Sequence, residues 1–545
     1  MKYIKNGNVC NYVLFLCVYN GNDIHKWMRI LLNYLFQKER KAMKRLITIL
    51  SLLSVLFSFP LSASAATTAT SVITKANIQA FDSSSLIKTD GSYWVWGGNL
   101  SVPTQVTGLT DVAASFDFQF VMKRDNTVWY WERSTPSSAS FKISPIKELN
   151  HIVSVESFGY DQVVVVNGDG KVYTIPQVDN KLDIAHITLI SGIDDVASIS
   201  SYFEIQDQKW EKRWVFLKKD GTVWVNRNEL TSFESIQSLD HVVDIQQNMA
   251  LKDDGTFWTW PSEFTAKELP VGKLTASSKQ ELANIQMFRT NGNTTIAIDK
   301  QSRLWFWGVT ITGYSDGTEF HVQKGFKQLT SIKDVKDAYI VERSLIVQTN
   351  DGKVQEASIE REAMPDNPTF NLITNDINLI KGGGRHFIMQ KNDGTLWGWG
   401  VNKNAQLGNG DYEFMHNIPV PVQQPVSIQL NGELIALTNG VITRNGQAFI
   451  PLRSIFEKLG ATVTWNESKK VVTISRTESG KPSLTIIINL QSGEVTMDNK
   501  AVQLPNKPFG VNGTSYLPLR FISESLGAKV DWKQKEQIIS ISDSR

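Results

Sequence analysis

Cysteine is almost absent from this chain of 545 residues. The two cysteines, Cys10 and Cys17, both lie within the first 42 residues. The rest of the sequence therefore offers no disulfide, no thiol nucleophile and no thiolate ligand for a metal. A chain of this length can bury a sizeable hydrophobic core without such covalent support.

An excess of charge of either sign is also missing. Lys and Arg number 56 against 54 Asp and Glu, which gives a formal net charge of +2. The first 65 residues hold nine of the basic and two of the acidic residues, so the remaining body carries a net charge of −5. A surface that binds nucleic acid is expected to be basic, so this balance argues against a nucleic-acid partner.

Long hydrophobic runs are confined to the N-terminal part. The basic start Met43 to Arg45 precedes an apolar run, Leu46 to Leu61, and the small residues Ala63 to Ala65 follow. This order predicts a cleaved secretory signal peptide over residues 43–65 and therefore an exported protein, with no membrane span after cleavage. An uncleaved N-terminal anchor is the alternative.

Residues 1–42 do not fit that layout. Lys38 to Lys41 can be encoded almost wholly by purines, as a ribosome-binding site just before Met43 would require. We expect translation to begin at Met43 and residues 1–42 to be a mis-assigned upstream extension. The mature chain would then contain no cysteine at all.

From about residue 70 to residue 425 one pattern recurs eight times. It consists of a short apolar strand, a turn that is usually Asp-Gly, and a second strand with tryptophan. Asp-Gly tolerates positive φ, so each copy predicts a β-hairpin. With a further short strand before most copies, each repeat supplies about four strands, the content of one propeller blade. The turn glycine or its substitute stands at positions 91, 126, 170, 221, 255, 302, 352 and 394.

Five of the copies carry a Trp-x-Trp pair. The two indoles of a pair lie on the same face of a strand, because side chains alternate along it. Their regular recurrence favours packing between blades over stacking platforms for sugar rings or bases. The pairs are Trp94/Trp96, Trp129/Trp131, Trp258/Trp260, Trp305/Trp307 and Trp397/Trp399.

The last copy contains a longer and more specific motif. Residues Gly383 to Gly408 read GGRHFIMQKNDGTLWGWGVNKNAQLG. This segment resembles a repeat of the regulator of chromosome condensation family. The resemblance implies an all-β propeller of seven or eight blades over residues 70–418. It does not imply the nuclear exchange-factor function, because the chain is predicted to be exported and its body is acidic.

After a Pro-rich link at residues 419–426 a second kind of repeat begins. Segments 446–465 and 513–532 share Pro-Leu-Arg, Leu-Gly and Trp landmarks at a constant offset of 67 residues. The pair resembles the copper amine oxidase N-terminal-like domain, also called the stalk domain, which is common in exported proteins of Gram-positive bacteria. The resemblance implies a small α+β domain over residues 427–543, in halves at about 427–478 and 484–543. We expect the link to be a semi-stiff spacer.

That resemblance carries no copper chemistry, because copper and the quinone of true amine oxidases belong to another domain. A copper site needs clustered imidazoles, and no histidine of the body has a neighbour at ligand spacing. The Asp-Gly turns lack the calcium-loop spacing, and Arg453 and Arg520 are expected to pair internally. We therefore predict no metal and no cofactor. The histidines of the body are His151, His186, His241, His321, His386 and His416.

No nucleophile, acid–base pair or phosphate-binding loop stands out, so we predict no catalytic residues and no enzyme. The first hypothesis is an exported scaffold whose propeller binds an extracellular protein, with the C-terminal domain as spacer or cell-envelope attachment. The alternative is a protein that binds cell-wall carbohydrate, and a propeller hydrolase or lyase is the third possibility. The binding residues, the partner and the oligomeric state stay open at this stage.

Overall fold

The computed structural model describes residues 77–543, except 136–137, 158–160, 180, 228, 270, 315–316 and 478–482. The predicted upstream extension and the predicted signal peptide lie outside the described residues. No helix among the described residues is both long and apolar enough to cross a membrane.

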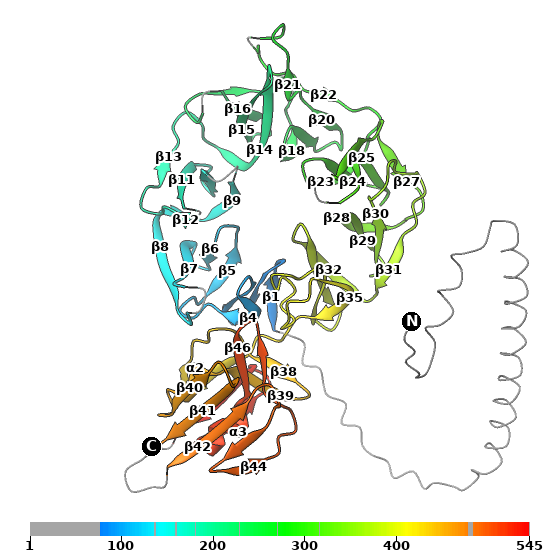
Figure 1. Cartoon of the computed structure of the whole chain (residues 1–545). Coiled ribbons are helices and arrows are strands. Elements are labelled where there is room, and N and C mark those ends of the chain that lie inside the picture. Colours follow the sequence, from blue (N-terminus) through cyan, green and yellow to red (C-terminus); the bar gives the residue numbers. More distant parts are fainter. Residues whose placement is uncertain are drawn as a thin grey trace, which may run out of the picture. The chain divides into compact units, whose positions relative to one another are not determined.

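Among the described residues, eight sheets form a ring of propeller blades (Figure 1). This resolves the predicted seven or eight blades to eight. Each sheet is built from consecutive antiparallel strands, except that a short strand of the blade 5 repeat joins blade 4 in parallel. The strands of blades 1 to 4 are β1 (Ile78–Phe81), β2 (Ser85–Lys88), β3 (Tyr93–Gly97), β4 (Leu100–Gln105); β5 (Val112–Ser115), β6 (Phe120–Lys123), β7 (Thr127–Arg133), β8 (Phe141–Asn150); β9 (Ile152–Ser157), β10 (Gln162–Asn167), β11 (Val172–Val178), β12 (Lys181–Leu182), β13 (Thr188–Leu189); and β14 (Val196–Gln206), β15 (Lys209–Lys218), β16 (Val223–Asn226), β17 (Phe233–Ser235), with β21 (Glu263–Phe264) added to the edge.

The second half of the ring repeats this arrangement. In each blade except blade 4, where β21 lies outside β14, the first strand of the repeat is an edge strand; the hairpin of the predicted pattern follows the first strand. The strands of blades 5 to 8 are β18 (Val242–Gln246), β19 (Met249–Lys252), β20 (Phe257–Thr259), β22 (Ser277–Ser278); β23 (Ile285–Thr290), β24 (Thr294–Asp299), β25 (Leu304–Thr312), β26 (Glu319–Val322), β27 (Lys327–Leu329); β28 (Val335–Val341), β29 (Ser344–Thr349), β30 (Val354–Ser358), β31 (Asn371–Thr374); and β32 (Ile377–Gly382), β33 (His386–Lys391), β34 (Leu396–Val401), β35 (Met415–Pro421).

All eight turn positions have the left-handed backbone that the sequence pattern predicts. Their φ angles lie between 59° and 87°, and Asn126 and Ser302 take the two places without glycine. At Gly170 a Cβ would lie 2.7 Å from the Cα of Asp195, where the chain enters the next blade. Glycine is therefore needed there for both its φ and its size.

Behind several turns a hydrogen-bonded chain of Asp, Thr and Trp, here called the turn relay, holds the hairpin. In blade 5, Asp254 Oδ1 accepts from the N–H and the Oγ1 of Thr256, at 2.8 and 2.7 Å. Thr256 Oγ1 in turn accepts from Trp258 Nε1 at 2.8 Å, and the Lys252 ammonium lies 4.3 Å from the centre of that indole. The hydrogen bonds from Thr256 hold the pKa of Asp254 below its ordinary value. The first tryptophan of the pair thus braces a turn.

The hydrophobic cores lie between neighbouring blades, face to face. Phe257 of blade 5 packs edge-on against Phe288 and Trp307 of blade 6, at centroid distances of 5.0 and 5.1 Å. The contact between blade 8 and blade 1, here called the seam, is made in the same way. There Trp96 Nε1 donates to the Gln406 carbonyl at 2.8 Å, and both residues of the Trp94/Trp96 pair are buried against Ile388. The ring closes without exchange of strands between its described ends.

The C-terminal domain is built from three sheets and two short helices. Its two halves share sheets: β39 pairs with β46, and β36 pairs with β48 in parallel. Its elements are β36 (Ser427–Leu430), β37 (Glu433–Leu434), β38 (Ile442–Arg444), β39 (Gln447–Pro451), α2 (Arg453–Phe456), β40 (Thr462–Asn466), β41 (Val471–Arg476), β42 (Leu484–Asn489), β43 (Val495–Met497), β44 (Lys500–Val502), β45 (Phe509–Val511), β46 (Thr514–Pro518), α3 (Leu519–Ser525), β47 (Lys529–Lys533) and β48 (Ile538–Ser542).

The Pro-rich link, which we expected to be a semi-stiff spacer, is packed at both of its ends. Residues 73–545 form one compact unit, and strand β35 runs to Pro421, inside the predicted link. Val422 is buried in the seam, and Val426 is buried in the core of the C-terminal domain. A link with a buried apolar side chain at each end cannot swing freely, because either motion would expose apolar surface to water.

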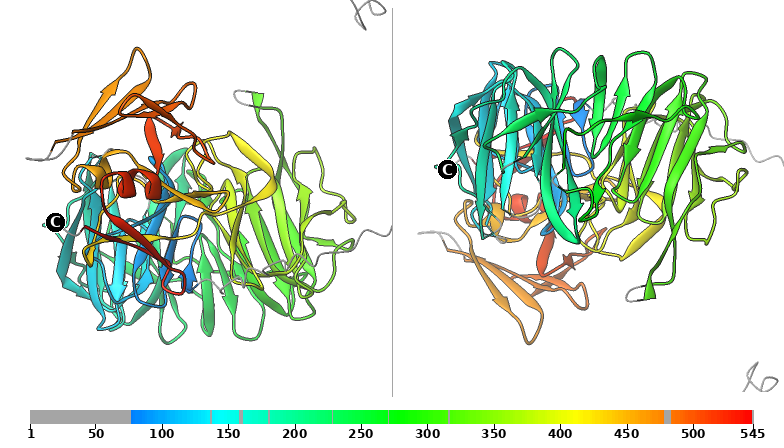
Figure 2. Two further views of the ribbon diagram at one scale, coloured as in Figure 1. Left: turned by 90° about the horizontal axis from the view of Figure 1, so that it is seen from below. Right: turned by 90° about the horizontal axis from the view of Figure 1, so that it is seen from above.

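Strand β4 of blade 1 lies against the C-terminal domain. Val102 is fully buried together with Phe449 and Tyr516. Around this core, Asn439 donates to Ser101 Oγ at 3.0 Å and the Gly440 N–H donates to Thr104 Oγ1 at 2.8 Å. In both views of Figure 2 the domain, orange to red, lies against the blue and cyan blades that begin the ring. The two domains therefore form a packed interface.

Candidate ligand-binding groove

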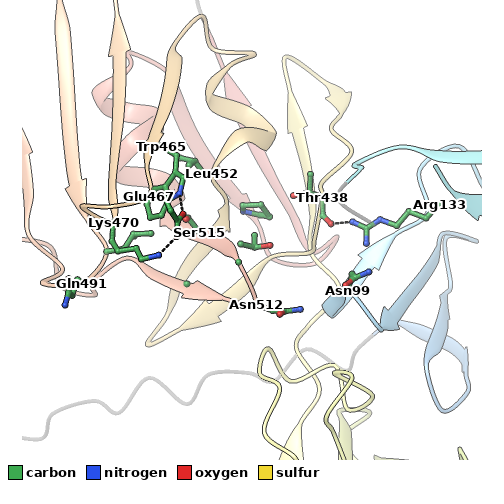
Figure 3. Close-up of a pocket in the computed structure, with 15 residues that line it drawn as sticks. Asn99, Arg133, Thr438, Leu452, Trp465, Glu467, Lys470, Gln491, Asn512 and Ser515 are labelled. Carbon is green, nitrogen blue, oxygen red and sulfur yellow. Dashed lines mark hydrogen bonds and ion pairs between the residues drawn. The ribbon is translucent and has the colours of Figure 1, made fainter. Parts of the chain in front are cut away.

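A groove of about 910 Å³ lies between the first blades and the C-terminal domain (Figure 3). The propeller contributes the turn before β4 and the end of β7. The C-terminal domain contributes β40, the turn before β41, the turn after β42 and the hairpin β45–β46. Concave sites at domain boundaries are common ligand-binding places. The residues that line the groove are Asn99, Arg133, Thr438, Pro451, Leu452, Trp465, Glu467, Lys470, Leu490, Gln491, Gly510, Asn512, Gly513, Thr514 and Ser515.

Trp465 forms one wall of the groove. Its indole is half-buried and packs against the core of the C-terminal domain. Its Nε1 donates to Glu467 Oε2 at 2.5 Å, and the same carboxylate pairs with Lys470. The hydrogen bonds from Lys470 and Trp465 keep the pKa of Glu467 below its ordinary value. The indole is therefore held in a fixed orientation with its polar edge occupied, and the Lys470 ammonium lies 6.0 Å from the centre of its ring.

Arg133 forms the opposite wall, on the propeller side. Its guanidinium donates to the Thr438 carbonyl and, through Nε, to the Ser138 carbonyl at 3.0 Å. Burial lowers the pKa of Arg133 from its ordinary value. The side chain bonds carbonyl groups on both domains, so it fixes the width of the groove.

Exposed amides complete the lining. Asn99, Gln491 and Asn512 are exposed and come from three different turns. Each amide offers both donors and an acceptor. At Gly513 a Cβ would meet no atom within 4 Å, so the groove has open space beside this hairpin. A groove that is lined by a half-buried indole and by separate amides suits a ligand with apolar faces and hydroxyl or amide groups.

The duplicated half of the domain lacks this arrangement. Trp532 is the counterpart of Trp465 at the 67-residue offset, but it is 42% exposed and lies outside the groove. The two tryptophans occupy the same place in the repeat, and only the first faces the propeller. Sequence reasoning missed the groove, because the two tryptophans share the landmarks of the repeat.

The predicted pairing of the two repeat arginines is observed for one of them. Arg520 pairs with Glu524 across one helical turn at 3.3 Å, and both side chains are exposed. The side chain of Arg453 is outside the described set. Arg520 is not among the described residues that line the groove.

The histidines of the propeller are mostly accounted for by local contacts. His386 Nε2 lies 2.9 Å from the Ser83 carbonyl across the seam, and burial lowers the pKa of His386. His186 pairs with Asp183 on the surface at 2.7 Å. The expectation that no histidine has a neighbour at ligand spacing is wrong for His416. Asp411 and Glu413 lie beside it, because the loop that carries them folds back onto β35.

Two hairpins of the propeller carry exposed aromatic side chains. On β14–β15, Phe203 and Trp210 are 44% and 65% exposed, and their rings meet edge-on at 5.5 Å. On β25–β26, Tyr314 and Phe320 are also mostly exposed. Exposed aromatic groups on protruding hairpins are typical of protein-binding surfaces.

Two family models match the chain. The copper amine oxidase N-terminal domain matches residues 429–541, and the regulator of chromosome condensation (RCC1) repeat matches residues 393–430. Both resemblances read from the sequence are therefore confirmed. Among curated proteins none matches this chain.

Solved propellers are similar to this chain at low identity. Prp20p from Saccharomyces cerevisiae, described with its binding to Gsp1p and histones, is 13% identical with a TM-score of 0.35, over 49% of this chain and 76% of that one. Human WBSCR16 is 17% identical with a TM-score of 0.38, over 62% of this chain and 94% of that one.

Proposed function

We propose that this chain is an exported, non-catalytic binding protein and that its groove binds a polysaccharide of the cell envelope. The half-buried indole of Trp465 carries this proposal. A sugar ring presents C–H groups on its faces and hydroxyl groups on its rim. The indole face suits the first, and the amides of Asn99, Gln491 and Asn512 suit the second.

The charge of the groove supports a neutral or weakly charged ligand. Glu467 and Lys470 neutralise each other, and Arg133 is engaged with carbonyl groups. A cationic ligand would meet no unpaired carboxylate among the described lining residues. Among these residues, an anionic ligand would meet only the charge of Arg133, whose guanidinium already donates to two carbonyl groups. Sugars that carry hydroxyl and acetamido groups are neutral and therefore suit this groove.

The acids of the groove support binding over hydrolysis. Glycoside hydrolysis uses two carboxyl groups that flank the bond. Among the described lining residues Glu467 is the one carboxylate, and its hydrogen bonds keep it ionised. A general acid would need a raised pKa, which is the opposite shift.

The test is a depletion isotherm of the full chain on purified, insoluble wall polysaccharide. Trp465→Ala is expected to weaken retention at least about tenfold, because an aromatic contact of this kind contributes on the order of 1 kcal/mol beyond its buried area. Trp532→Ala is the matched control: it removes the same residue type from the same place in the repeat, outside the groove.

Each outcome decides the proposal. If Trp465→Ala loses retention on the polysaccharide and Trp532→Ala retains it unchanged, the proposal is supported. No retention of the unmodified chain, or equal loss in both variants, removes the groove as a polysaccharide site.

A protein partner for the propeller is a second candidate, favoured by the Phe203–Trp210 pair. A pull-down from culture supernatant with the full chain tests it. Trp210→Ala is expected to lose a stoichiometric protein partner and to keep polysaccharide retention, since Trp210 lies outside the groove. A partner retained equally by Trp210→Ala would remove this hairpin as the contact.

A further inference from the structure

We propose that Asp411, Glu413 and His416 form a binding site for a divalent transition-metal ion such as Zn²⁺. The three residues lie on the loop between β34 and β35 and at the start of β35 itself. One ligand atom of each lies within 4.8 Å of the others. This inference concerns the propeller seam and is independent of the groove.

The distances around the imidazole leave room for an ion. Nε2 of His416 lies 3.1 Å from Asp411 Oδ1, and Nδ1 lies 3.9 Å from Glu413 Oε2. The second distance is too long for a hydrogen bond. Because the two ring nitrogens point in opposite directions, one ion binds one of them. The 3.1 Å between Nε2 and Asp411 Oδ1 suits two ligand atoms that share an ion at the usual 2.0–2.2 Å of zinc–nitrogen and zinc–oxygen bonds, and the Glu413 carboxylate completes the set.

The loop holds its ligands in place before an ion arrives. The fully buried Asn402 donates through Nδ2 to Asp411 Oδ1 at 2.7 Å, and Asn409 donates to Asp411 Oδ2 at 2.6 Å. The Glu413 N–H donates to Asp411 Oδ1 at 3.1 Å. Hydrogen bonds of this kind to a ligating side chain hold it in position before the metal binds and reduce the free-energy cost of binding.

The local charge also favours a cation. Among the described residues, the ion pairs of Asp411 and Glu413 are with His416 alone, and Arg444 acts on Asp411 through its charge without an ion pair. With a neutral imidazole the cluster carries two negative charges, which a divalent ion neutralises. The His416 side chain is only 12% exposed, whereas that of Glu413 is 71% exposed. The site is therefore partly enclosed and open on one side to water.

The donor set selects the class of metal. One imidazole nitrogen with two carboxylates suits Zn²⁺, Mn²⁺ or Co²⁺, whereas Ca²⁺ and Mg²⁺ prefer oxygen ligands throughout. Three protein ligands leave further positions for water.

Binding at this loop would act on ring closure. The Tyr412 hydroxyl, between two of the ligands, donates to the Gly98 carbonyl at 3.1 Å. The Gly410 N–H donates to the Ser101 carbonyl at 3.0 Å. Both acceptors belong to blade 1, so an ion that orders the loop also orders the seam.

The experiment is equilibrium dialysis of the full chain against Zn²⁺, with Cys10 and Cys17 alkylated so that thiols bind none. Bound metal is measured by mass spectrometry, and Co²⁺ substitution is followed by visible absorption. We expect the unmodified chain to bind one more ion than His416→Ala and Glu413→Gln, and to show Co²⁺ bands that both variants lose. At roughly 100 times Kd, Zn²⁺ should raise Tm by about 3 °C.

The control is His186→Ala, which removes a histidine beside a single carboxylate, Asp183. It should bind as much metal as the unmodified chain. Glu413→Gln changes an exposed side chain and keeps the fold, so it separates lost ligation from lost structure. Equal metal content in all four proteins, or none in the unmodified chain, overturns the proposal.

Discussion

The propeller and the C-terminal domain are both built from sequence repeats, but the repeats assemble in opposite ways. Most propeller repeats make a complete sheet from their own strands, and neighbouring blades meet through packed side chains and a few backbone hydrogen bonds. The exception is β21, which comes from the repeat of blade 5 and is added to the sheet of blade 4. The two C-terminal repeats exchange strands, so that β39 and β46 share one sheet and β36 and β48 share another. Self-similarity in a sequence therefore establishes duplication but not modularity.

The number of strands per repeat accounts for the difference. A propeller repeat contributes four or five strands, enough to pair every central strand within the repeat. The equivalent hairpins β38–β39 and β45–β46 have two strands each, and an isolated hairpin is marginal in water. Pairing β39 with β46 satisfies backbone groups that each half alone would leave at an edge.

The largest expected effect is in the shared sheets. Phe449→Ala removes a fully buried ring beside Val102 and Tyr516. We expect a loss of about 4 kcal/mol in the free energy of unfolding. Hydrogen exchange should rise in both β39 and β46, because the halves unfold together. Faster exchange in the first half alone would show that the halves are separable, and Trp532→Ala is the exposed control.

A large-to-small substitution in the propeller core should speed up hydrogen exchange over a smaller region than Phe449→Ala does. Leu345→Ala in blade 7 removes a fully buried side chain that packs with Ile296 and Phe306 of blade 6. We expect a loss of about 3 kcal/mol. Faster hydrogen exchange should be confined to blades 6 and 7. Equal acceleration in blades 2 and 3 would contradict the modular description of the ring.

The turn relays should contribute less again. Thr256→Val keeps the shape of the side chain and removes the hydroxyl that joins Asp254 to Trp258. We expect a loss of about 1 kcal/mol, measured by denaturant unfolding. The control is Thr462→Val on β40, an exposed position where a change within about 0.5 kcal/mol is expected. Equal effects would mean that the relay does not stabilise the hairpin.

The smallest expected effects are on how the free energy of unfolding changes with pH. Two carboxyl groups of the propeller should change it in opposite directions. Burial raises the pKa of Glu156, which accepts from Ser201 Oγ at 2.9 Å, whereas hydrogen bonds lower the pKa of Asp254. A raised carboxyl pKa adds stability as the pH falls, and a lowered one loses stability as the pH falls through the folded-state value.

Unfolding free energies at several pH values test these signs. The stability of the unmodified chain relative to Glu156→Gln should increase from pH 7 towards the ordinary glutamate pKa of 4.5. Its stability relative to Asp254→Asn should decrease below the ordinary aspartate pKa of 3.8. If both relative stabilities changed with pH in the same direction, the raised pKa of Glu156 or the lowered pKa of Asp254 would be contradicted.

Much of the propeller could be predicted because its repeat is local. Positive φ at the turn, alternation along a strand and the Trp-x-Trp pair all act within about ten residues, and the eight turns stand where the sequence predicts them. The seam, the packed link and the groove depend on which surfaces meet. Trp465 and Trp532 share the landmarks of the repeat, although Gln534 and Gln537 stand where Trp465 has Glu467 and Lys470. Which of the two tryptophans lies in the groove depends on the tertiary fold. His416 was missed because its partners are acids on a folded loop, not other histidines.

The C-terminal domain follows blade 8 in the sequence but is bonded to blade 1. Asn77 and Lys88 of blade 1 donate to the carbonyls of Lys535 and Glu536, and Ser101 and Thr104 accept from Asn439 and Gly440. The domain is therefore joined covalently to the last blade and by hydrogen bonds to the first blade, so it links the two ends of the ring. Because the domain and blade 1 belong to one chain, the domain docks onto blade 1 at a high effective concentration. Removing the domain would turn a closed ring into one held at the seam by face packing and loop contacts alone.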